Sequence, residues 1–144
     1  MIEFEEPTVA VVKHGNPSGI ASRNNLTEAF KLAYAADPVS AFGGIIAVNR
    51  PPTVELIGVM KKIFFELIVA PDFKKEIVKM LGENHRRMRV VKAQRPPRQL
   101  EFTRAFNGYL IQTPDDIVEK RDKWQIITGK KPAPSEFADL EFAW

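Results

Sequence analysis

Three short runs of apolar, largely β-branched residues constrain the fold of this chain most. They occupy residues 8–12 (TVAVV), 45–48 (IIAV) and 67–70 (LIVA). None of them alternates apolar with polar residues, which predicts strands that are buried on both faces. Such strands fit a largely parallel sheet covered by helices, and they do not fit an antiparallel sheet with one face in water.

Helical patterns fill the intervals between these runs. Asn25 is placed to cap a helix that ends at Asp37-Pro38, and its apolar face repeats at helical spacing in Leu26, Ala29, Phe30 and Ala33. Residues 51–53 (PPT) open a second helix, and Asp72 and Ser135 are the expected caps of two more. Further strands are expected at residues 88–91, 109–111 and 125–127.

This alternation of strands and helices predicts an α/β fold with three layers, α/β/α, around a mixed but largely parallel sheet. The length of 144 residues suits one domain, over residues 1–144. The absence of cysteine excludes disulfides, cysteine-ligated zinc and thiol catalysis, and it fits a reducing cytoplasm. The first residues are acidic where a secretory signal is basic, and no apolar run is long enough to cross a membrane. We therefore expect a cytoplasmic protein.

Basic charge is concentrated between residues 84 and 107. Seven arginine and lysine residues and one glutamate lie between His85 and Arg104, whereas the net charge of the whole chain is +3. Pro96-Pro97 favours an extended loop or linker there. A solvated basic loop is the simplest interpretation. A nucleic-acid surface is the alternative, although aromatic residues for base stacking are missing before Phe102.

Ligands of open α/β sheets bind beyond the carboxyl ends of strands, so the loops after Val12, Val39 and Ala70 are the candidate sites. Lys13 and His14 follow the first strand directly. Lysine can hold an anion or donate a proton, and histidine is the usual general base near neutral pH. Asn-Pro and Ser-Gly dipeptides predict that residues 13–19 form a loop, in which Gly19 would permit close approach of a ligand. An exposed polar turn without function is the alternative.

A second glycine-bearing loop spans residues 40–44 (SAFGG). Its backbone N–H groups could bind a phosphate or the polar edge of a ring, and a tight turn into the next strand is the alternative. Glu66 is either a half-buried ligand group or the end of a helix face. The histidines lack partners at metal-ligand spacing, so no metal site is expected.

Four segments, taken in order, resemble one family. They are residues 12–19 (VKHGNPSG), 37–50 (DPVSAFGGIIAVNR), 65–71 (FELIVAP) and 107–112 (NGYLIQ). Together with the closing DLEFAW they are similar to the AICAR transformylase domain of the bifunctional purine biosynthesis protein. The resemblance implies a cytidine-deaminase-like α/β unit, the first of two in that domain. It also implies formyl transfer from 10-formyltetrahydrofolate to aminoimidazole carboxamide ribonucleotide, with no metal.

The resemblance also assigns roles. His14 would accept the proton of the attacking amine, and Lys13 would stabilise the oxyanion or protonate the departing folate nitrogen. Asn16 would orient His14 or the carboxamide. The expected substrate-binding residues are Asn16, Ser40, Ala41, Phe42, Gly43 and Glu66.

The family usually has cysteine where this chain has Ser18. Family members also carry further segments before and after the matched region, and their site is completed across a dimer interface. We therefore expect this chain to be weakly active or inactive alone, and to form a homo-oligomer or pair with a complementary C-terminal half. The alternative functions are a non-catalytic module that binds nucleotide or folate and, less favoured, a basic protein associated with nucleic acid.

Overall fold

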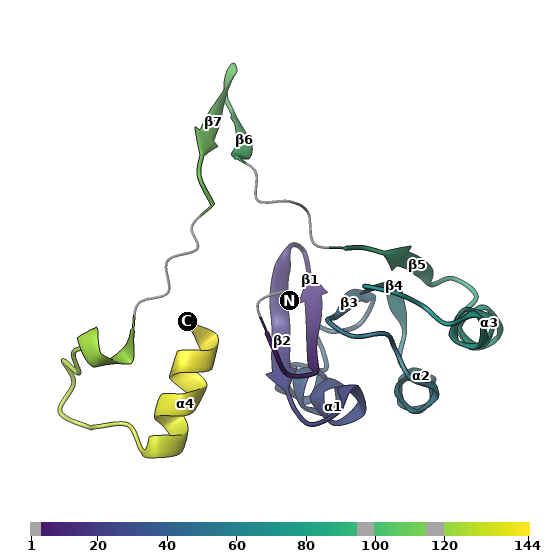
Figure 1. Cartoon of the computed structure of the whole chain (residues 1–144), viewed down its shortest axis with the longest axis horizontal. Helices are drawn as coiled ribbons and strands as arrows, with labels where there is room; N and C mark the ends of the chain where they lie inside the picture. The colour runs from purple at the N-terminus through teal and green to yellow at the C-terminus, as the bar shows by residue number, and fades with distance from the viewer. Residues whose placement is uncertain (1–3, 95–99, 115–119) are drawn as a thin grey trace. The chain divides into compact units, whose positions relative to one another are not determined.

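The computed structural model describes residues 4–94, 100–114 and 120–144 (Figure 1). It divides the predicted single domain into two compact units, Met1–Arg95 and Pro96–Trp144. The predicted basic linker over residues 84–107 contains one strand from each unit, Arg89–Lys92 (β5) and Glu101–Ala105 (β6). Its Pro96-Pro97 pair lies outside the described residues.

The first unit contains a five-stranded sheet in the order β2-β1-β3-β4-β5. Its strands are Thr8–Lys13 (β1), Asn16–Ser22 (β2), Gly44–Val48 (β3), Phe65–Ala70 (β4) and β5. β1 runs antiparallel to both of its neighbours, while β3, β4 and β5 are mutually parallel. The predicted α/β class with a mixed sheet is confirmed. The sheet was expected to be largely parallel, and two of its four strand pairings are parallel. Strand β2 was missed because its sequence, NPSGIAS, has the composition of a turn.

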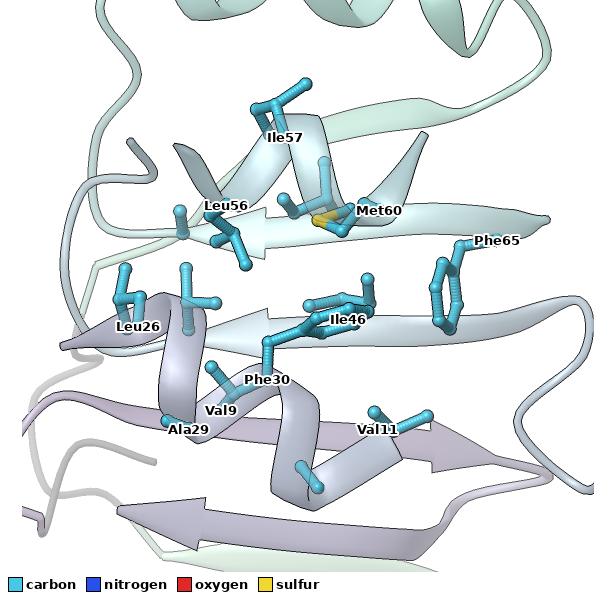
Figure 2. Packing of buried hydrophobic residues seen from close by; sticks show 14 of the residues in the cluster. Val9, Val11, Leu26, Ala29, Phe30, Ile46, Leu56, Ile57, Met60 and Phe65 are labelled. Carbon is cyan, nitrogen blue, oxygen red and sulfur yellow. The ribbon is translucent and has the colours of Figure 1, made fainter. Parts of the chain in front are cut away.

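The helices of this unit are Leu26–Ala36 (α1), Val54–Met60 (α2) and Lys75–Asn84 (α3). They form one layer on one face of the sheet (Figure 1). Figure 2 shows the core between them, where side chains of the strands meet those of α1 and α2. Phe30 and Phe65 pack edge to face with their ring centroids 6.0 Å apart. These contacts bury the apolar stripe of each helix, which is the main source of helix stability in a globular protein.

The opposite side, here called the open sheet face, carries apolar residues that alternate with the core residues along the strands. In the described part of the unit these side chains are exposed or half-buried, and they are Val12, Ile20, Ile45, Leu67, Val69 and Val91. The predicted strands with two apolar faces are therefore present, with one face packed under the helices of this unit.

Two of the predicted helix starts are confirmed. The Asn25 side chain accepts the N–H of Glu28 at 2.9 Å, and that of Thr53 accepts the N–H of Leu56 at 3.2 Å. The other two were wrong. Asp72 instead forms an ion pair with Lys92, with 2.7 Å between Oδ1 and Nζ, and α3 begins later, at Lys75.

The second unit contains β6, Gly108–Gln112 (β7), a 3-10 turn at Arg121–Lys123 and Pro134–Ala143 (α4). Helix α4 begins one residue before Ser135, with proline in its first turn and Glu136 accepting the N–H of Ala133 at 2.6 Å. Residues 125–127 are not a strand, contrary to the prediction. β6 and β7 form an antiparallel hairpin whose large apolar side chains are exposed. None of the described helices is long and apolar enough to cross a membrane.

Gly19 brings helix α1 against strand β2. A Cβ atom at this position would lie 1.9 Å from the backbone oxygen of Ala33 in α1. The prediction that Gly19 admits a ligand was therefore wrong, because the space in front of it is filled by the helix backbone. The glycine is required for helix–sheet packing.

We expect Gly19→Ala to lower the free energy of unfolding by about 3 kcal/mol or more, since helix and strand must separate. Gly82 in α3 has nothing within 4 Å of its hypothetical Cβ, so Gly82→Ala is the matched control. It should stabilise by up to about 1 kcal/mol through helix propensity. Urea denaturation of both variants measures the difference, and equal midpoints would contradict the packing role.

His85 predicts a pH-dependent stability. Its Nε2 atom is buried and has no hydrogen-bond partner among the described residues, and burial lowers the pKa of His85 below its ordinary value of 6.5. The unfolded chain therefore binds a proton at this residue more readily than the folded chain does. The resulting stabilisation is complete above pH 6.5 and is lost as the pH falls through the lower, folded-state pKa.

We expect urea midpoints to decrease between about pH 7 and pH 5.5, above the range in which most carboxylates titrate. His85→Gln should flatten this dependence, whereas substitution of the other histidine, His14→Gln, should preserve it. An unchanged slope in His85→Gln would show that another group is responsible.

Candidate functional site

Lys13 and His14 lie at the tip of the β1–β2 hairpin. His14 and Gly15 form its turn with φ angles of 54° and 84°, and Lys13, the last residue of β1, pairs with Asn16, the first residue of β2. Two successive residues with positive φ are typical of a type I′ hairpin turn. The prediction of a loop over residues 13–19 holds only for this turn, because strand β2 begins at Asn16. Pro17 is accommodated because β2 is an edge strand.

Two irregularities in the strand pairing lie near the same strand ends as this turn. In β2, Ser18 lies between two paired residues and has no partner on β1, and its Oγ donates to the carbonyl of Val11 at 3.2 Å. In β4, Glu66 likewise has no partner on β3. Such bulges redirect side chains. Alternation alone already makes Glu66 exposed after the core residue Phe65, and the bulge explains why the next core residue is Ile68 and not Leu67.

The loop at residues 40–44 satisfies its own backbone N–H groups. The N–H of Ser40 donates to Asp37 Oδ1 at 2.9 Å, and those of Ala41, Phe42 and Gly44 donate to carbonyls within residues 37–41. The N–H of Gly43 donates to the carbonyl of Phe64 at 2.9 Å. The prediction that these groups bind a phosphate is therefore not supported, and the alternative of a tight turn describes the loop better.

The carbonyl oxygens of the loop accept hydrogen bonds from Lys13. The Lys13 ammonium donates to the carbonyls of Phe42 and Gly43, each at 3.0 Å. An ammonium group has three donors, so these two contacts leave one donor for another acceptor. Lys13 therefore joins the hairpin to the loop and still presents a hydrogen to the site.

Asp37 anchors the beginning of the loop. Hydrogen bonds from the side chain and the backbone of Ser40 hold the pKa of the Asp37 carboxyl below its ordinary value of 3.8. The carboxylate is thus ionised at neutral pH and keeps its acceptor role. Asp37 was predicted only as the end of helix α1, which its place as C-cap confirms.

A cavity of about 470 Å³ brings the hairpin tip and the loop together. Five of the predicted site residues line it, namely Lys13, His14, Asn16, Ser40 and Phe42. Gly43 and Glu66 lie beside it, since a Cβ on Gly43 would be 3.2 Å from Lys13 Nζ and 3.8 Å from Glu66 Oε1. Ala41 differs from the others, because its side chain is 0% exposed and belongs to the core.

The loop after Ala70 does not belong to this site. β1 is antiparallel to β3 and β4, so its carboxyl end lies at the edge where those parallel strands begin. Ala70 ends β4 at the other edge. Of the three candidate loops, those after Val12 and Val39 therefore meet at this cavity, and the loop after Ala70 does not.

Phe64 and Asp37 are the site residues that the sequence reasoning missed. The ring of Phe64 packs against that of Phe42 with a centroid distance of 5.4 Å. Asp-x-x-Ser is a recognisable turn signal, whereas Phe64 stands beside the core residue Phe65 and has no distinguishing pattern. Within the described ranges no three His, Cys, Asp or Glu residues are grouped as metal ligands.

The fold and this cavity define a mixed-sheet α/β protein with a Lys-His hairpin tip facing a glycine-bearing loop. A family model described as AICARFT/IMPCHase bienzyme matches residues 1–144. The chain belongs to this family.

Several relatives in this family carry the description bifunctional purine biosynthesis protein PurH. That of Enterococcus faecalis is 40% identical over 144 residues, which cover 99% of this chain and 28% of the relative. Those of Lactococcus lactis subsp. cremoris and a Thermoanaerobacter species are 40% and 36% identical, with the same coverage. The chain thus spans 28% of the length of these relatives.

Gly43→Ala should disturb the site more than Gly15→Ala does. Both glycines have positive φ, at 65° and 84°, so both substitutions strain the backbone by about 1 kcal/mol. Only at Gly43 does the added Cβ also meet Lys13 Nζ, at 3.2 Å. We expect a larger fall in the urea midpoint for Gly43→Ala, together with a shift of the Lys13 side-chain NMR signals. Equal effects of both variants would contradict this contact.

Proposed function

We propose that this chain supplies part of a formyl-transfer site of purine biosynthesis. In this reaction the formyl group of 10-formyltetrahydrofolate passes to the exocyclic amine of aminoimidazole carboxamide ribonucleotide. Family membership supports the proposal, and the observation that carries it is the single cavity lined by Lys13, His14 and the loop at residues 40–44. The folate is a co-substrate, and the proposed reaction uses no metal.

His14 is assigned the role of general base. The amine nitrogen attacks the formyl carbon, His14 accepts the amine proton, and the bond from the formyl carbon to the folate nitrogen breaks. The imidazole is exposed at the hairpin tip, and its side chain makes no hydrogen bond within the described residues, so it is available to a substrate proton. A general base of this kind typically contributes about 10²- to 10⁴-fold in rate.

Lys13 is assigned to the charge that develops on the formyl oxygen, or to protonation of the departing folate nitrogen. Two carbonyls fix its ammonium before any substrate binds, and its third donor remains for the reacting group. Preorganised donors of this type stabilise a developing oxyanion without reorganisation during the reaction.

The substrate-binding roles remain with Asn16, Ser40, Phe42, Gly43 and Glu66. Phe42 presents an exposed ring at the cavity, suited to stacking on a flat heterocycle. The backbone N–H groups of the loop are already used, so contacts there come from side chains and carbonyls. Ala41 contributes only by packing the loop onto the core.

We also propose that the chain works in the cytoplasm with further polypeptide, as a homo-oligomer or with a complementary C-terminal half. The open sheet face and the exposed apolar side of the β6–β7 hairpin support this, because surfaces of that kind mark interaction sites. Neither a membrane nor nucleic acid is needed for the proposed reaction.

His14→Ala should abolish turnover and retain ligand binding. The assay follows the absorbance of released tetrahydrofolate, with the chain alone and with a separately supplied C-terminal half. We expect turnover to fall by about 10²-fold or more in the combined sample, since the base is lost. His85→Gln, which changes the other histidine outside the cavity, is the matched control.

Each result of this assay has a defined meaning. Unchanged turnover in His14→Ala would rule out the base assignment. Absence of turnover in the unsubstituted chain, alone and combined, would contradict formyl transfer. If nucleotide or folate still bound in that case, the chain would be a binding module.

A further inference from the structure

We propose that Phe64, a residue outside the predicted site, is a positioning residue that fixes the ammonium of Lys13 through the loop at residues 40–44. The importance of Lys13 rests on the proposed function, whereas the positioning itself rests on contacts within this chain. Phe64 reaches Lys13 through one intermediate, the Phe42–Gly43 segment.

Phe64 holds this segment in two independent ways. Its backbone carbonyl accepts the N–H of Gly43 at 2.9 Å. Its ring packs against the ring of Phe42, with 5.4 Å between centroids and 48° between planes. The backbone contact sets the position of Gly43, and the ring contact sets the position of Phe42. These are the two residues whose carbonyls bind Lys13.

The space around Gly43 shows how closely the groups are fitted. A Cβ built on Gly43 would lie 3.2 Å from Lys13 Nζ and 3.6 Å from Phe64 Cε1. The ring of Phe64 and the ammonium of Lys13 therefore both border this glycine. Because Gly43 has a φ of 65°, its carbonyl direction depends on a left-handed conformation that the surrounding contacts must hold.

Phe64 is itself placed by the core. The next residue, Phe65, is 1% exposed and begins strand β4, and Ile63 packs against the core cluster. The Phe64 side chain, by contrast, is 38% exposed, so little of the core depends on its ring. At the other end of the loop Asp37 holds Ser40. The loop is thus fixed at both ends, and Phe64 is the anchor nearer to Lys13.

The test measures the reactivity of Lys13 toward trace acetic anhydride, quantified by mass spectrometry of peptides. Acylation needs the nitrogen lone pair, and an amine held by two carbonyls must leave them to react. We expect Phe64→Ala to raise the acylation rate of Lys13 about fivefold, as for the loss of about one hydrogen bond. Phe64→Tyr, which keeps the ring, should restore the original rate. The rate at Lys31, an exposed lysine on α1, should not change.

Val54→Ala on the exposed side of α2 is the matched control and should leave Lys13 unaffected. An unchanged Lys13 rate in Phe64→Ala, or an equal increase in Phe64→Tyr, would overturn the proposal. If Phe64→Ala unfolded the chain, all lysines would react faster, and Phe64→Leu would take its place. A faster reaction at Lys13 alone in Phe64→Leu would support the proposal, and an unchanged Lys13 rate would overturn it. The measurement needs no substrate, so a failure of formyl transfer would leave its result intact.

Discussion

The close contact between Gly19 and the backbone of α1 is the constraint on which the site geometry depends. It lets helix α1 lie directly on β2, with the carbonyl of Ala33 in the place that a side chain would fill. The helix then covers the core residues of β1 and β2. It thereby supports the hairpin that carries Lys13 and His14 on the helical face of the sheet. A larger residue at Gly19 would force α1 and β2 apart. Packing in the middle of β2 therefore helps to position the hairpin tip.

The site is unusual in how it uses its glycine-bearing loop. Such loops commonly bind anions through free N–H groups, but here those groups are bound within the loop or to Phe64. The loop instead uses the carbonyls of Phe42 and Gly43, which accept hydrogen bonds from the ammonium of Lys13. The loop thus contributes to the site by placing a positive charge. An anionic substrate group would meet the ammonium of Lys13 and would not meet the loop backbone.

Much of the fold followed from the sequence, for physical reasons that differ between elements. The strands with two apolar faces and the caps at Asn25 and Thr53 were predicted because burial and capping are local signals. Strand β2 was missed because an edge strand tolerates Pro17 and Gly19, which are otherwise turn residues. The antiparallel pairing of β1 with β2 was missed together with β2, since that pairing follows from the tight turn at His14-Gly15.

Within the cavity, the sequence pointed to residues with chemically reactive side chains and missed residues that hold them in place. Lys13, His14 and the loop at residues 40–44 were predicted from their residue types and from the family resemblance. The contact of Phe64 with Phe42 and the bulge at Glu66 depend on how β3 and β4, which are distant in sequence, lie against each other. No local sequence pattern encodes that arrangement. Ala41 was taken as a ligand contact because it lies inside the motif, whereas its methyl group is part of the core.

Two demands conflict at His14. Its left-handed backbone favours another residue type, whereas the proposed function needs an imidazole. Its φ of 54° is one that glycine and asparagine adopt more easily than histidine does. Selection for stability alone would therefore favour replacing the imidazole. If His14 is the general base proposed above, relaxed selection would let the chain gain stability at the hairpin tip by replacing it. The residue found at this turn thus reports which of the two pressures has prevailed.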